Sequence, residues 1–161
     1  MKKWVASGLL LTACVLVFGG GQMRSLIVGE ARSLFGTAQD RTTAGTDDDH
    51  NGIRDDVDAF IAREYRKSPK QIVYAQRLAR VLQTESITRS SSRDQAVKII
   101  EEENLALACL RYSTTQESRS AIAPKFSSIT FNTLERRRNN GTTWAVFGPG
   151  EIKGVKEGDC K

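Results

Sequence analysis

The 161-residue chain lacks most of the residues on which enzyme and zinc sites depend. It has one histidine, His50, and three cysteines, so no zinc ligand set can be assembled. A dyad of Cys109 with His50 is the only arrangement that would supply a catalytic thiol, and Cys109 is better explained as half of a disulfide. A glycine-rich phosphate-binding loop is also missing. These absences favour a protein that is not an enzyme.

A large charge excess and a long hydrophobic run are also absent. The formal net charge is +5, and removal of Lys2 and Lys3 would leave 22 basic against 19 acidic residues, a net of +3. This balance is too small for a nucleic-acid-binding surface. The uncharged run Trp4 to Phe18 is shorter than the roughly 20 residues of a membrane-spanning helix. The length favours one globular domain.

The N-terminus is typical of an export signal. Lys2 and Lys3 precede the apolar run, and three glycines follow it, so residues 1–21 are predicted to be a signal peptide. Leu11-Thr12-Ala13-Cys14 resembles a bacterial lipobox, which implies acylation of Cys14. Ordinary cleavage near Gly21, a lipoprotein signal that ends before Cys14 and an uncleaved anchor remain open. In each case we expect an exported protein, periplasmic or secreted, with membrane attachment only through this segment.

Two cysteines remain after the signal region. Cys109 and Cys160 form an even pair, and an oxidising compartment would join them in a disulfide. Two unrelated buried thiols are the alternative. The position of Cys160 beside the C-terminus favours the disulfide.

Apolar spacing predicts a mainly α fold, a small helical domain of three to four helices with an irregular C-terminal tail. Residues 22–46 are expected to form a short helix and a linker, and residues 55–161 a helical domain. Helices are predicted over about 56–66, from Ser68-Pro69 to about Glu85, and for about eighteen residues after the cap Ser92. A short last helix is expected after a cap at Asn132, with a stop at Asn139-Asn140-Gly141. Residues 113–120 are expected to be non-helical, and the tail from Thr142 irregular or a short hairpin.

The most informative stretch is the acidic loop, residues 47–58, DDDHNGIRDDVD. Oxygen-bearing side chains occupy its positions 1, 3, 5, 9 and 12, with a glycine at position 6 for a sharp turn. A hard cation such as calcium takes six to eight oxygen ligands from such a wrap. The predicted ligands are the side chains of Asp47, Asp49, Asn51, Asp55 and Asp58 and the carbonyl of Ile53. A solvated turn that caps the next helix is the alternative.

The acidic loop resembles the thrombospondin type 3 repeat and, more distantly, the EF-hand, over these twelve residues. The resemblance implies calcium coordination. Two departures from the EF-hand are Asp58 in place of glutamate at position 12 and the apolar Ile53 at position 7 instead of position 8. No helix is predicted to enter the loop, so a sensor that opens on binding calcium is not favoured. The chain also resembles small exported bacterial proteins that carry one such loop before a helix, a resemblance that implies no particular function.

We therefore expect an exported calcium-binding structural protein, with Ca2+ as its ligand and no protein partner that the sequence identifies. The alternative is an envelope module that binds an anionic surface or a partner protein. Its candidate cations lie either on the polar helix faces or in one basic run: Arg63, Arg66, Lys67, Arg77 and Arg80, or Arg136 to Arg138. The run Glu101 to Glu103 is interpreted as a solvated helix face rather than a metal or catalytic cluster.

Overall fold

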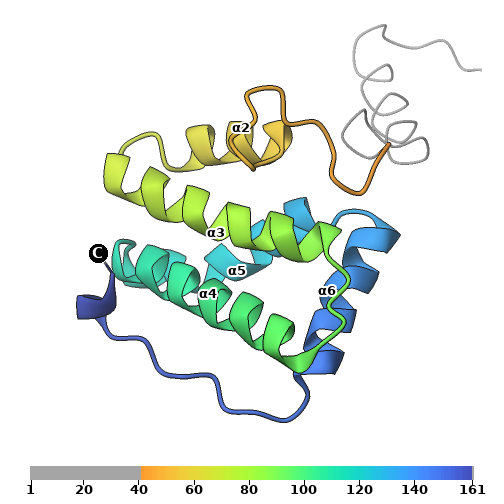
Figure 1. Cartoon of the computed structure of the whole chain (residues 1–161). Helices are drawn as coiled ribbons and strands as arrows, with labels where there is room; N and C mark the ends of the chain where they lie inside the picture. The colour runs from red at the N-terminus through yellow and green to blue at the C-terminus, as the bar shows by residue number, and fades with distance from the viewer. Residues whose placement is uncertain (1–40, 161) are drawn as a thin grey trace, which may run out of the picture. The chain divides into compact units, whose positions relative to one another are not determined.

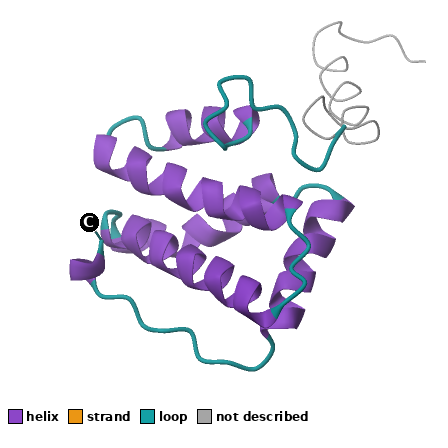
Figure 2. Ribbon diagram, viewed as in Figure 1, coloured by secondary structure: helices purple, strands orange, loops and turns teal. Residues whose placement is uncertain are grey.

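The computed structural model describes residues 41–160, and within this range it is helical, without strands (Figure 2). The elements are α2 (Asp55–Glu64), α3 (Pro69–Ile87), α4 (Arg93–Tyr112), α5 (Gln116–Thr130), α6 (Leu134–Phe147) and a 3₁₀ turn, η2 (Glu157–Asp159). The predicted fold class, a small and mainly α domain, is confirmed. The expected signal at residues 1–21, Cys14 and most of the expected linker at 22–46 lie outside the described residues.

The helices α2, α3 and α4 form where the sequence predicts them, α2 from its apolar spacing and α3 and α4 from their caps as well. Ser68 caps α3 by accepting a hydrogen bond from the Gln71 amide, and Pro69 is its first residue. Ser92 caps α4 in the same way through the Gln95 amide. Each helix buries the apolar face that the periodicity indicates, with Leu78 and Ile100 each 1% exposed.

The helix α5 was not predicted. Its sequence, QESRSAIAPKFSSIT, is mostly polar and carries Pro124 in its interior, which lacks an amide hydrogen for the helical bond. Its buried residues are Ile122, Phe126 and Thr130, spaced four apart along one narrow stripe. Burial of Phe126 against Phe60, with ring centroids 5.4 Å apart, stabilises a helix whose local sequence does not favour it.

The helix α6 differs from its prediction at both ends. Its cap is Thr133, whose hydroxyl accepts from the Arg136 amide, because the side chain of the expected cap Asn132 accepts from the Arg136 guanidinium instead. The helix also continues through the expected stop at Gly141 to Phe147. The residues expected to begin an irregular tail or hairpin are therefore helical, because Thr143 and Phe147 are buried one turn apart.

The helices enclose two separate apolar clusters. The larger cluster joins side chains of α2, α3, α4 and α5, with Phe126, Leu110 and Ile53 fully buried. The smaller cluster joins Ala96 and Ile100 of α4 to Phe147 of α6. In Figure 1, α3 and α4 run side by side through the middle, with α2 along the outer side of α3 and α6 at one end of the pair. Helix α6 therefore lies outside the main core.

The segment after α6 returns along α4 as an extended strap, residues 148–160 (Figure 1). The Asn104 side chain donates to the Lys153 carbonyl at 2.9 Å, and the Tyr112 hydroxyl donates to the Val155 carbonyl at 2.9 Å. At its end, the sulfurs of Cys109 and Cys160 lie 2.07 Å apart, so the predicted pair is at disulfide distance. Among the described helices, none is long and apolar enough to cross a bilayer.

Candidate metal centre

The acidic loop closes on itself just before α2. Its base is held by two bonds of Asp55: the Asp55 amide donates to the Thr46 carbonyl at 2.9 Å, and the Asp55 carboxylate accepts from the Asp48 amide at 3.0 Å. Its turn passes through two residues with positive φ, His50 at +58° and Gly52 at +82°. A residue without Cβ is suited to this conformation at Gly52, which the motif predicts.

Three of the predicted ligand carboxylates gather around Asn51. The two oxygens of Asp47 accept from the amides of Asn51 and Gly52, at 3.1 and 3.0 Å. The Asn51 side-chain amide, through Nδ2, donates to Asp49 at 3.0 Å and to Asp58 at 2.5 Å. Residues from both ends of the loop therefore converge on a single amide group. Two acids share the hydrogen atoms of one neutral donor, so their charges are not neutralised there.

The other two predicted ligands have structural roles in the loop. Asp55 closes the base, as described above. Ile53 has a fully buried side chain in the larger apolar cluster, and its amide donates to the Asn51 side-chain oxygen at 2.7 Å. The apolar residue at position 7 thus anchors the loop to the helices, while the side chains of the other predicted ligands remain partly or wholly exposed.

Side chains from the bundle fix the loop in place. Arg80 of α3 donates through Nε to the Asn51 carbonyl at 3.0 Å. Ahead of the loop, Gln83 of α3 donates to the Ala44 carbonyl at 2.6 Å, and Arg136 of α6 donates to the carbonyls of Thr42 and Thr43. The segment expected to be a free linker is therefore anchored from residue 42 onward, through contacts that its own sequence does not encode.

Arg54, inside the loop sequence, does not neutralise the predicted ligands. Its side chain is fully buried and pairs with Asp56, with Nε 2.5 Å from the carboxylate. Within residues 41–160, the ion pairs Arg54–Asp56 and Lys125–Glu64 include none of the five predicted ligand side chains. In the same range, no three His, Cys, Asp or Glu side chains are placed so that they could hold a metal ion. The donors are chemically suited to calcium, but they are arranged for hydrogen bonds to amides.

Two other sequence interpretations are revised by the structure. Glu101 and Glu102 are exposed as expected, but Glu103 is half-buried, because it lies on the side of α4 that turns toward the other helices. Arg136 is fully buried and donates to Thr42, Thr43 and Asn132, so it cannot contribute to the basic surface proposed for Arg136 to Arg138. The local sequence does not indicate that Glu103 or Arg136 is buried, since each belongs to a run of charged residues.

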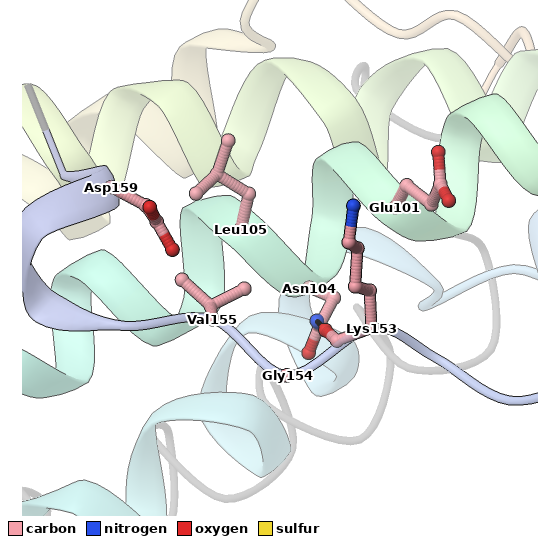
Figure 3. A pocket seen from close by; sticks show the side chains of 7 residues that line it. All are labelled: Glu101, Asn104, Leu105, Lys153, Gly154, Val155 and Asp159. Atoms are coloured by element: carbon pink, nitrogen blue, oxygen red, sulfur yellow. Dashed lines mark hydrogen bonds between the residues drawn. The ribbon is translucent and has the colours of Figure 1, made fainter.

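A cavity of about 360 Å³ lies between α4 and the C-terminal strap (Figure 3). Glu101, Asn104 and Leu105 line it from α4, and the strap contributes Lys153 to Val155 and Asp159. Figure 3 shows Leu105 and Val155 between Asp159 at one end and the polar group of Glu101, Asn104 and Lys153 at the other. The two acids of this cavity therefore do not converge as a catalytic carboxylate pair would.

The chain was compared with protein-family models, with curated proteins and with solved structures, and no match was found in any of the three.

Proposed function

We propose that this chain is an exported structural protein whose acidic loop, residues 47–58, binds calcium and thereby staples α2 to the rest of the helical domain. The predicted ligands are the side chains of Asp47, Asp49, Asn51, Asp55 and Asp58 and the carbonyl of Ile53.

One observation carries the proposal: Asp47, Asp49 and Asp58 gather around Asn51, and neither ion pair of residues 41–160 includes any of the three. The guanidinium of Arg80 donates to the Asn51 carbonyl. Like charges held this close repel one another, and a neutral amide offsets that repulsion only in part. A divalent cation would take the place of the Asn51 amide hydrogens as the positive partner of Asp49 and Asp58. Asn51 would then coordinate the ion through its side-chain oxygen.

The stapling role follows from the elements that the loop joins. Asp58 belongs to the first turn of α2, Arg80 ties the Asn51 carbonyl to α3, and Arg54 reaches the end of α5. An ion bound between Asp47, Asp49 and Asp58 would hold the start of the loop against α2. Its binding energy would therefore oppose separation of α2 from α3 and α5.

The export and non-catalytic parts of the proposal have separate support. The pairing of Cys109 with Cys160 suits an oxidising compartment, which agrees with the predicted signal at residues 1–21. The acids Glu101 and Asp159 face a cavity without converging. We therefore propose a structural role and no catalysis.

The test is a thermal melt of the protein with its disulfide intact, first in excess chelator and then in millimolar calcium, with magnesium as the control. For a dissociation constant near a tenth of a millimolar, linkage gives about 1–2 kcal/mol of stabilisation. This corresponds to a rise in Tm of about 3–8 °C for a domain of this size. Magnesium should produce no comparable rise, because it requires a tighter octahedral geometry.

A pair of adjacent variants assigns the effect to the loop. Asp49→Asn removes a predicted ligand charge, whereas Asp48→Asn changes an exposed acid that is not a predicted ligand. The calcium-dependent rise should disappear in the first variant and persist in the second. If calcium leaves the Tm of the unmodified protein unchanged, or raises it equally in both variants, the acidic loop is a helix-capping turn and not a calcium site.

A further inference from the structure

Two acids, each with a carboxylate oxygen that is closed off from solvent, lie where α3, α4 and α6 join. Glu85 of α3 is completely buried, and one of its carboxylate oxygens accepts from the Asn140 side chain of α6 at 2.8 Å. The other oxygen of Glu85 and one oxygen of Glu103 of α4 are inaccessible to solvent, and neither has a hydrogen-bond partner within the described part of the chain. Buried carboxylates normally have such partners, so this junction requires an explanation.

The surroundings of Glu85 favour a bound proton over a paired cation. Glu103 is the charged side chain that acts on it from α4, and α6 contributes the neutral amide of Asn140. Burial, followed by the neighbouring Glu103, raises the pKa of Glu85 to about 8, against a small opposing effect of Asn140. Burial also raises the pKa of Glu103. Within residues 41–160, neither of the described ion pairs includes either acid.

A cavity that is open to solvent adjoins this junction. This cavity of about 680 Å³ is walled by α4, α5 and α6, and Glu103 and Asn140 line it. The charged group on its α6 side is Arg137, which is exposed and donates to the Phe131 carbonyl at 3.2 Å. The α5 side contributes only the uncharged Ser127 and Ser128. Hydration of an ionised Glu85 from this side would separate α6 from α3.

Helix α6 is held to the rest of the domain largely by polar contacts. Its buried residues are mostly polar: Arg136, Asn139, Thr143 and Phe147. It docks on α3 and the residues after it through hydrogen bonds, from Asn139 to the Ser86 carbonyl at 2.8 Å and between Ser90 and Thr143 at 2.9 Å. The larger apolar cluster contains no residue of α6. Loss of the polar junction would therefore weaken α6 first.

We propose that the buried Glu85 carries a proton, which its neighbour Glu103 helps to retain, and that this protonated acid is a pH-sensitive latch that keeps α6 docked on α3 and α4. When this proton leaves, the buried negative charge of Glu85 is unpaired and is repelled by Glu103, α6 detaches, and water enters through the neighbouring cavity. The larger apolar cluster keeps α2, α3, α4 and α5 folded during this opening.

The direction of the pH dependence follows from the raised pKa. The docked state binds the proton more tightly than the open state, so the contribution of the latch is complete below the ordinary carboxyl pKa of 4.5 and is lost as the pH rises to about 8. Within this window the opening equilibrium of α6 should increase by up to about tenfold per pH unit, and above it the increase should level off.

Native-state hydrogen exchange on the intact, disulfide-bonded protein tests this prediction. Amides of α6 should lose protection between pH 5 and pH 8, beyond the intrinsic base catalysis of exchange, while amides of α3 near Leu78 should not. Glu85→Gln keeps an acceptor for Asn140 and removes the titrating charge, so it should abolish the pH dependence at α6. The exposed Glu102→Gln is the matched control and should leave it unchanged.

A carbon-13 titration of the glutamate carboxyls tests the unmodified protein without any variant. One carboxyl should titrate near pH 8, well above the others. The proposal is overturned if both Glu85 and Glu103 titrate in the ordinary range, if α6 and α3 amides respond equally to pH, or if Glu85→Gln behaves like Glu102→Gln.

Discussion

Replacement of Arg54 by methionine should be among the most damaging single changes in the domain. The guanidinium is fully buried and forms two bonds with Asp56, from Nε at 2.5 Å and from Nη2 at 2.9 Å. It also donates to the carbonyls of Ile129 at 2.6 Å and Thr130 at 3.4 Å, in the last turn of α5. One side chain therefore pairs with an acid at the start of α2 and donates hydrogen bonds to carbonyls at the end of α5.

The size of the effect follows from these contacts. Methionine has an apolar stem of comparable length, so the loss is mainly that of the charge and the donors. Removal of one partner from a buried ion pair costs about 3–5 kcal/mol. The side chain of Asp56 is 30% exposed and can be partly rehydrated, so we expect a smaller loss for Arg54→Met. That loss should be about 2–4 kcal/mol of unfolding free energy, or about 6–15 °C in Tm.

Urea unfolding followed by circular dichroism, at fixed calcium concentration, measures this loss. Arg66→Met is the control, because Arg66 is exposed, and its effect should stay within about 0.5 kcal/mol. A double variant, Arg54→Met with Asp56→Leu, should recover part of the loss, since it leaves no partly buried acid without its cationic partner. An Arg54→Met protein as stable as the control would refute the structural role assigned to this side chain.

Two further predictions concern the core and the C-terminal strap. Phe126→Ala should cost about 3–5 kcal/mol in a denaturant titration, because the ring is fully buried and contacts Phe60 and Tyr65; an effect below 1 kcal/mol would contradict the packing of α5. The Cys109→Ala, Cys160→Ala double variant should lower stability by about 4 kcal/mol in the chain-entropy model, given the separation of 51 residues. If calorimetry gives the same Tm with and without the bridge, the strap contributes nothing to folding.

Local sequence signals predicted the helices that have both a cap and an apolar stripe. Ser68 and Ser92 provide a side-chain oxygen at the boundary, and the residues after them repeat at helical spacing, so local chemistry and burial agree. For α5 they do not agree. Its buried stripe of Ile122, Phe126 and Thr130 is narrow and its interior carries Pro124, so only the contacts that it makes in the bundle identify it as a helix.

In the candidate site, too, local sequence predicted some features and tertiary contacts decided others. The spacing of acids around Gly52 predicted a closed loop, and the backbone has the positive φ that this motif requires. The sequence could not predict that Arg54 would point away from these acids, because its partners, the carbonyls of Ile129 and Thr130, lie some 75 residues further along the chain. The environment of Glu85 depends likewise on the docking of α6, whose Asn140 donates to its carboxylate.

By itself, then, the sequence determined the mainly α fold, three of the helices, the pairing of Cys109 with Cys160 and the closed shape of the acidic loop. Each of these depends on residues close together in the chain or on simple pairing. Only the tertiary structure decided the helix at α5, the length of α6 and which charged residues are buried. The physical reason is that burial is set by contacts between segments that are distant in the sequence. The residues next to a charged side chain in a polar run do not indicate whether another helix will cover it.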